Sequence, residues 1–136
     1  MNGITVNAPF NFGVELLKSI LVTAFEGGIG YWAKLDGYEN LPAKPPAFAQ
    51  DTHSEDFTYP RYAWLPLTEK GGVRLADRED GKVCDKPLNL KTLTAGLTQL
   101  AAERLAVFSR FVNENYDADD ADMLVQYALF GRVVYG

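Results

Sequence analysis

The sequence predicts a single α+β domain covering residues 1–136, and three observations support this class. Apolar residues recur at helical spacing near the N-terminus and through the last third of the chain. Between them lies a segment rich in turn signals and β-forming residues. The composition, 47% hydrophobic and 23% charged, is that of an ordinary globular domain. A chain of this length buries roughly two-thirds of its unfolded surface, which suffices for a core.

The first predicted element is a helix over residues 14–26. Its apolar side chains form one broad face at helical spacing: Val14, Leu17, Leu21 and Phe25. Gly27 and Gly28 follow directly, and such glycines often supply the left-handed residue that ends a helix.

The middle of the chain is predicted to form a small antiparallel sheet. Residues 31–35 alternate as a short strand, and residues 39–56 form a long, polar, proline-rich loop. Residues 57–68 and 73–77 are predicted as the two strands of a hairpin that turns at Gly71-Gly72. On that hairpin Tyr62 and Trp64 would share the core face. Asp80-Gly81 predicts a further tight turn.

The last third of the chain is predicted to form two helices and a short closing strand. The first helix runs to Val112 from a cap at Asn89 or Thr92, and the second begins at its cap Asp117 and ends at Gly131. The second is apolar nearly all round, so we expect it to be deeply buried. Residues 133–135 are predicted to close the fold as a strand. Six residues are expected to be nearly fully buried: Leu21, Phe25, Leu100, Phe108, Leu124 and Phe130.

Charge and cysteine content indicate which partners and which cellular compartment to expect. Thirteen basic against eighteen acidic residues give a net charge of −5, which opposes general nucleic-acid binding. No apolar run approaches the roughly 20 residues of a membrane span, and no signal peptide is evident. The single cysteine, Cys84, suits a reducing compartment. We therefore expect a cytoplasmic protein without a membrane partner, and the oligomeric state stays open, a homo-oligomer included.

The segment from Glu26 to Trp32 is the first candidate ligand site. Glu26 lies in the last helical turn, where its charge opposes the helix dipole by about 0.3–1 kcal/mol. Gly28 allows a close backbone approach, and Tyr31 and Trp32 offer flat faces on which a planar ligand would stack. Alternatively, the segment is a helix end and a core strand, with Glu26 solvated or paired with Lys34. The glycines follow a helix, so they predict no phosphate-binding loop.

Aromatic and basic residues around the predicted hairpin form the second candidate surface. Such mixtures stack on bases and neutralise phosphates. We expect Arg61 and Arg74 to be exposed and available to a ligand, while the simpler interpretation is a half-buried strand. The residues concerned are Tyr59, Arg61, Tyr62, Trp64, Lys70 and Arg74.

No motif predicts catalysis, a metal site or a cofactor. His53 is the only histidine, in a polar loop without a second imidazole, so we expect it to be dispensable. The acids between residues 114 and 122 either cap a helix or imitate a row of phosphates. They are Glu114, Asp117, Asp119, Asp120 and Asp122.

Residues 20–32 (ILVTAFEGGIGYW) and 121–136 (ADMLVQYALFGRVVYG) resemble the start and the end of a family of small bacteriophage and prophage proteins. The resemblance covers about a quarter of the chain and includes no catalytic signature. It departs at Arg132, where relatives often carry an acid. It implies a phage-encoded accessory protein, a class that often counters host defence.

Two functional hypotheses follow. In the first, a non-enzymatic binding protein sequesters a small nucleotide-like ligand in the bacterial cytoplasm. Tyr31 and Trp32 would stack on the base, Glu26 would accept bonds from ribose, and Arg61 or Arg74 would neutralise phosphate. In the second, an anti-CRISPR-like inhibitor covers a host defence complex with its acidic surface and the loop 39–56.

Overall fold

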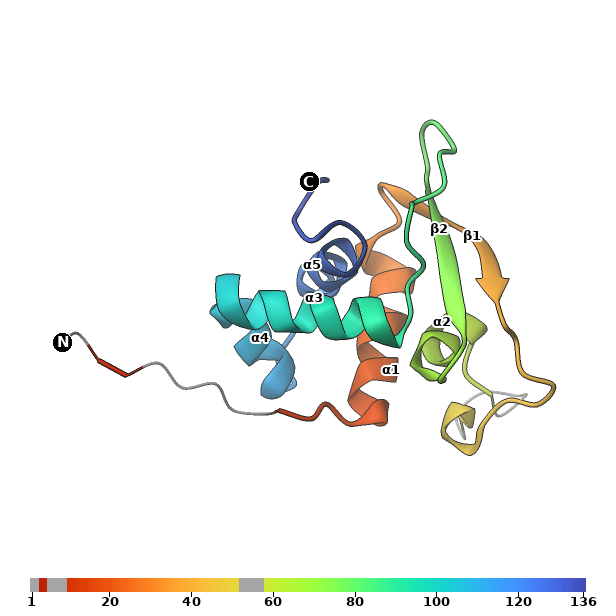
Figure 1. Cartoon of the computed structure of the whole chain (residues 1–136), viewed down its shortest axis with the longest axis horizontal. Coiled ribbons are helices and arrows are strands. Elements are labelled where there is room, and N and C mark those ends of the chain that lie inside the picture. Colours follow the sequence, from red (N-terminus) through yellow and green to blue (C-terminus); the bar gives the residue numbers. More distant parts are fainter. Residues whose placement is uncertain (1–2, 5–9, 52–57) are drawn as a thin grey trace.

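The computed structural model describes residues 3–4, 10–51 and 58–136, and helix α1, Val14–Thr23, lies at its centre. Figure 1 shows α1 between a two-stranded ribbon on one side and three helices on the other. The ribbon consists of β1 (Ala33–Glu39) and β2 (Gly72–Asp77). The remaining described helices are α2 (Arg61–Trp64), α3 (Leu90–Glu103), α4 (Leu105–Val112) and α5 (Ala118–Phe130). The predicted α+β class is confirmed.

Helix α1 continues into a π-helical turn, Ala24–Gly28, where a left-handed glycine was expected. The amide of Ile29 donates to the carbonyl of Ala24, five residues back, at 2.9 Å. The helical segment ends at Gly28, but neither Gly27 nor Gly28 has a positive φ, so the predicted left-handed cap is wrong. Gly28 instead provides space, because a Cβ atom there would lie 2.7 Å from the Ala118 carbonyl oxygen. The turn thereby packs closely against the start of α5.

Strand β2 has neighbours on both sides. It pairs antiparallel with β1, so that Ala33 lies opposite Asp77, rather than with the segment before Gly71. On its other side, Val73 and Leu88 exchange backbone hydrogen bonds of 2.9 and 2.8 Å. The amide of Cys84 also donates to the carbonyl of Leu75 at 2.9 Å. The predicted strand at 73–77 is confirmed, its predicted partner is wrong, and the segment 82–88 is fixed against it.

Within the predicted strand 57–68, residues 61–67 are helical rather than extended. Helix α2 begins after Pro60 and is followed by a short 3-10 helix, Leu65–Leu67. Proline cannot donate to a sheet ladder, and residues 63–67 are all buried, which a strand with two different faces could not achieve. Trp64 lies in the core as predicted, whereas Tyr62 is half-buried and stacks on Phe25 at 4.4 Å.

The predicted long helix before Val112 is interrupted. Arg104 has non-helical φ and ψ angles of −137° and 61°, so α3 and α4 are separate and three helices follow the sheet. The predicted caps are confirmed: Asn89 and Asp117 each accept a backbone N–H of their helix, and Gly131 ends α5 with a φ of 71°. α5 is buried along most of its length, as expected.

The predicted closing strand at 133–135 is absent from the described structure. Gly131 turns the chain back along α5, and the side chain of Gln126 bonds the returning backbone. A side chain therefore supplies the partner that a neighbouring strand would have supplied.

Three of the six predicted core residues are fully buried: Leu21, Leu100 and Leu124. The three phenylalanines are half-buried, so that part of the prediction is wrong. Each of these rings packs at the edge of the core, as Phe108 does against Phe12 at 5.4 Å. None of the helices in the described ranges combines the length and apolar character needed to cross a bilayer.

Candidate ligand-binding site

The C-terminal residues are held by a buried polar network centred on Asp122 of α5. Its carboxylate, in a residue only 7% exposed, accepts the Trp32 indole N–H at 2.8 Å and the Tyr31 hydroxyl at 2.6 Å. The Gln126 amide donates to the same carboxylate at 3.0 Å. No ion pair of the described residues includes Asp122, so neutral donors alone satisfy this charge. Burial, followed by the bond to Asp122, raises the pKa of Tyr31 to about 12.

Tyr135 is fixed on three sides. The Gln126 carbonyl oxygen accepts the amides of Val134 and Tyr135 at 2.7 and 2.8 Å. The Tyr135 ring stacks on Trp32, with centroids 4.6 Å apart and planes 7° from parallel. Its hydroxyl donates to the Asp77 carboxylate at 2.6 Å, which lowers the pKa of Asp77 and raises that of Tyr135 to about 12. The position of this ring is therefore set before any ligand arrives.

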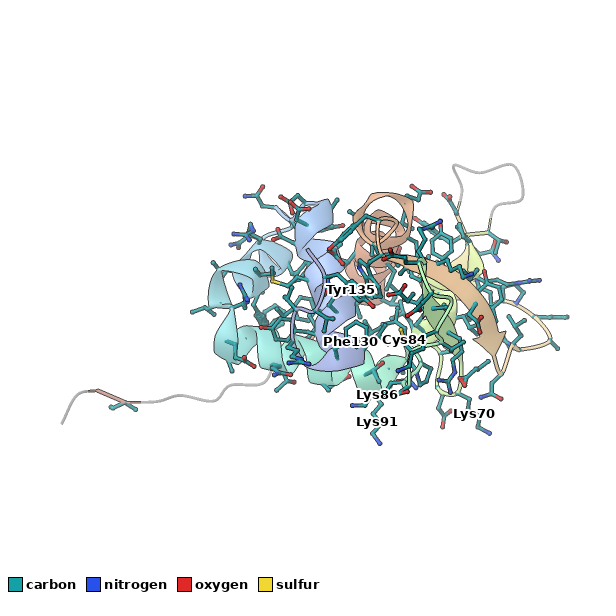
Figure 2. The ribbon with its side chains drawn as sticks, turned by 90° about the horizontal axis from the view of Figure 1, so that it is seen from above. Lys70, Cys84, Lys86, Lys91, Phe130 and Tyr135 are labelled. Carbon is teal, nitrogen blue, oxygen red and sulfur yellow. The ribbon has the colours of Figure 1, made fainter. Side chains whose placement is uncertain are left out.

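A cavity of about 450 Å³ lies between this C-terminal tail and the segment that follows β2; we call it the tail cavity. Figure 2 shows Tyr135, Phe130 and Cys84 close together, with Lys86 extending from the same side. Two aromatic rings, Phe130 and Tyr135, line it with their centroids 6.0 Å apart. Its charged lining consists of the cations Lys82, Lys86 and Arg132 and the acids Asp77, Asp80 and Asp85.

The cations of the tail cavity have no ion-pair partner within the described ranges. Two of the acids, in contrast, are engaged by the turn itself. Asp77 accepts the amides of Glu79 and Asp80 as well as the Tyr135 hydroxyl, and Asp80 accepts the amide of Lys82. The ammonium groups therefore remain available to an anion, although the formal charges of the lining cancel.

Cys84 contributes a neutral wall to this cavity. Partial burial, and then the nearby carboxylates of Asp77 and Asp85, raise the pKa of its thiol. Such a thiol stays protonated at neutral pH and is a poor nucleophile. The geometry consequently favours binding over covalent chemistry at this position.

The residues predicted from the sequence are distributed over several places. Trp32 is 3% exposed and stacks on the Tyr135 ring, while Tyr31 is 56% exposed. Both line a further cavity together with Tyr135. Neither lines the tail cavity, where Tyr135 provides the aromatic surface.

Glu26 and Arg61 lie together in a different place, a cavity of about 710 Å³ that we call the Glu26 cavity. Tyr59 and Trp64 line it as well. Glu26 is exposed, and the pKa of Tyr62 is raised by burial and then by the negative charge of this carboxylate. The suggested pair of Glu26 with Lys34 is not among the ion pairs of the described residues.

Gly28 and Arg74 belong to neither cavity. Gly28 is buried against Ala118. Arg74 was expected to be exposed but is half-buried: it pairs with Glu39 at 3.2 Å and donates to the carbonyls of Cys84 and Asp85. Arg74 therefore holds the backbone at Cys84 and Asp85, two residues that line the tail cavity.

Most of the acids between residues 114 and 122 have structural roles. Asp117 caps α5, Asp122 is buried, and Asp120 accepts two bonds from Arg110 at 2.7 and 2.8 Å. This guanidinium lowers the pKa of Asp120. His53 lies outside the described residues. In the part of the chain that the structure describes, no cluster of three or more His, Cys, Asp or Glu could hold a metal ion.

Sequence reasoning missed Phe130, Tyr135 and the cations Lys82, Lys86 and Arg132. One available signal was that the tail after Gly131 combines a cation with an aromatic ring. Comparison of the chain with protein-family models, with curated proteins and with solved structures finds no match.

Proposed function

We propose that this protein binds a small nucleotide-like ligand in the tail cavity and sequesters it without chemical change. The observation that carries the proposal is the combination of two aromatic rings with three cations that have no ion-pair partner among the described residues. A planar base would lie against Phe130 and Tyr135, and a phosphate would bind Lys82, Lys86 and Arg132.

The size and rigidity of the site support this assignment. A cavity of about 450 Å³ falls within the roughly 300–1,000 Å³ typical of small-molecule sites. The Tyr135 ring is held by Trp32, Asp77 and Gln126, so little order has to be created on binding. Such preorganisation raises affinity because the cost of immobilising side chains falls.

The resemblance to small bacteriophage proteins supports an accessory, counter-defence role. The two segments that carry it, residues 20–32 and 121–136, meet in the structure. Trp32 and Tyr31 from the first bond Asp122 from the second. The residues behind the resemblance are thus those that fix the wall of the tail cavity. Withdrawing a signalling nucleotide from a host defence system would be the biological result.

Titration calorimetry tests the proposal directly. The 5′-monophosphates of adenosine, guanosine, cytidine and uridine are compared with the unphosphorylated nucleosides. We expect at least one monophosphate to bind, and Lys86→Gln or Arg132→Gln to weaken it by about 1.5–3 kcal/mol, tenfold or more. Lys44→Gln, an exposed lysine of the loop 39–56, is the matched control and should bind normally. Absence of binding by all the monophosphates contradicts the proposal.

The alternative hypothesis, inhibition of a host defence complex, has less structural support. It relies on the acidic segment and the loop 39–56, and three of the five acids already have structural roles. Affinity capture from infected cells followed by native mass spectrometry separates the two hypotheses. A stoichiometric host protein would favour the inhibitor, and a retained small molecule would favour sequestration.

A further inference from the structure

We propose that the sequestered ligand carries a second phosphate, as a 5′-phosphorylated dinucleotide does, and that Lys70, Lys86 and Lys91 bind it. We call these three residues the lysine edge. The inference rests on the proposed function, because Lys86 also lines the tail cavity and so joins the two sites.

The fold brings these lysines to one end of the ribbon. Val73 and Leu88 exchange two backbone hydrogen bonds, which fixes the segment after Lys86 beside β2. A Cβ atom on Gly72 would lie 3.7 Å from the Cβ atom of Asn89. Gly72 is two residues from Lys70, and Asn89 is two residues from Lys91. Figure 2 shows Lys86 and Lys91 extending from the same side of the molecule, with Lys70 farther along it.

The charge of the lysine edge is available to a ligand. All three lysines are exposed, and no ion pair within the described ranges includes them. Two exposed acids, Glu69 and Asp85, are sequence neighbours of Lys70 and Lys86 and moderate the local potential. Three lysines against two acids leave a net positive edge on a chain whose overall charge is −5.

This charge distribution favours a small polyanion over an acidic protein. Charges separated by more than about 8–10 Å are largely screened at physiological salt, so a dinucleotide would interact mainly with the nearby lysines. An acidic protein would cover a larger area and meet the negative remainder of the surface. A second phosphate on the lysine edge would also bind at high effective concentration once the base occupies the tail cavity.

The test compares the best-binding 5′-mononucleotide with its 5′-phosphorylated dinucleotide by calorimetry at two salt concentrations. We expect the dinucleotide to bind at least about fivefold tighter, with a steeper salt dependence. Lys91→Gln should weaken the dinucleotide about two- to fivefold and leave the mononucleotide unchanged. Lys34→Gln is the matched control. Lys34 is also exposed, but it lies at the start of β1, away from the end that pairs with Gly72.

The outcomes separate the inference from the proposed function. If the mononucleotide binds but the dinucleotide binds no tighter, or if Lys91→Gln affects both equally, the inference is overturned and the proposed function stands. If neither nucleotide binds, both fail. A short polyglutamate peptide that binds more tightly than the dinucleotide, and loses affinity in Lys91→Gln, would assign the edge to an acidic protein and also overturn the inference.

Discussion

The tail cavity and the Glu26 cavity differ in charge and in how their walls are held. Three cations and three acids line the tail cavity, and the cations have no ion-pair partner among the described residues. The Glu26 cavity is larger and presents Glu26 and Asp51 against one cation, Arg61, which lies 5.8 Å from the centroid of the Tyr38 ring.

The aromatic walls of the two cavities are held by different contacts. Tyr135 at the tail cavity is fixed by ring stacking, by its hydroxyl and by its backbone. At the Glu26 cavity, Trp64 bonds the Tyr59 carbonyl at 2.9 Å, and the ammonium group of Lys18 lies 4.3 Å from the centroid of the Tyr59 ring. The difference teaches that volume alone does not identify a binding site. The smaller cavity has the cations without ion-pair partners and the rigid aromatic surface that suit an anionic, planar ligand.

Removing the side chain that holds the tail should have the largest effect. Gln126→Leu leaves the part-buried amides of Val134 and Tyr135 without their acceptor, whereas the Asp122 oxygen that Gln126 bonds keeps the Trp32 indole N–H. Each amide without a partner costs about 1–3 kcal/mol, so we expect a loss of at least about 2 kcal/mol and the loss of nucleotide binding. Urea unfolding measures the first and calorimetry the second.

Gln99→Leu is the matched control, because Gln99 makes one bond to the neighbouring Gly131 carbonyl. It should cost about 1 kcal/mol and preserve binding. Equal destabilisation by the two variants would show that the network around Gln126 does not hold the tail.

The contact beneath the tail cavity should be the next most sensitive. Gly96 of α3 lies against α5, where a Cβ atom would approach the Ala128 amide nitrogen to 2.9 Å. Gly96→Ala should force the helices apart and destabilise the protein by about 1–3 kcal/mol. Gly30→Ala introduces the same atom where no atom lies within 4 Å, so its midpoint in urea should stay near wild type. A Gly96→Ala variant as stable as wild type would contradict this packing.

Acid stability should depend on the pair between Asp120 and Arg110. The pKa of Asp120 in the folded state is lowered, chiefly by its bonds to Arg110. Stability from this carboxylate is therefore present above the ordinary pKa of about 3.9 and is lost as the pH falls through the lowered value. Arg110→Gln should be less stable at neutral pH and lose less on acidification, as measured by thermal melts from pH 7 downward. An unchanged pH profile would contradict this role.

The smallest effect is expected at the Glu26 cavity. Glu26→Gln removes a charge near the end of a helix, so thermal stability should be unchanged or rise slightly. The pKa of Tyr62 should move toward its ordinary value, because this carboxylate contributes to raising it. Nucleotide binding should be unaffected. A loss of about 1–3 kcal/mol in binding would assign the ligand to the Glu26 cavity instead.

Short sequence patterns predicted the elements that are determined by residues close together in the chain. The cap at Asp117, the apolar surface of α5 and the stop at Gly131 are all visible in the sequence, and the structure confirms them. The segment after Pro60 was predicted wrongly, because its aromatic residues favour strands in general while its two prolines and its continuous burial favour short helices here. The break at Arg104 has no glycine or proline to mark it.

The candidate site depends on contacts between distant parts of the chain. Trp32 was predicted to stack on a ligand, but it is buried against Tyr135 and bonds Asp122, 90 residues away. The tail resembled a strand because valine and tyrosine favour strands, whereas the bonds from Gln126 determine its course. Neither relationship leaves a local pattern, so the location of the tail cavity could not be derived from spacing or composition.

The π-helical turn at Ala24–Gly28 affects which changes of length the chain can accommodate at this point. A π-helical turn holds one residue more than an α-helical turn, so deleting one residue inside α1 rotates its apolar face by about 100° unless this turn closes to a regular one. Adding a residue to the turn has no such remedy, and it would move Trp32 relative to Asp122. In related chains that lack one residue in this part, we therefore expect a regular helix in place of the π-helical turn.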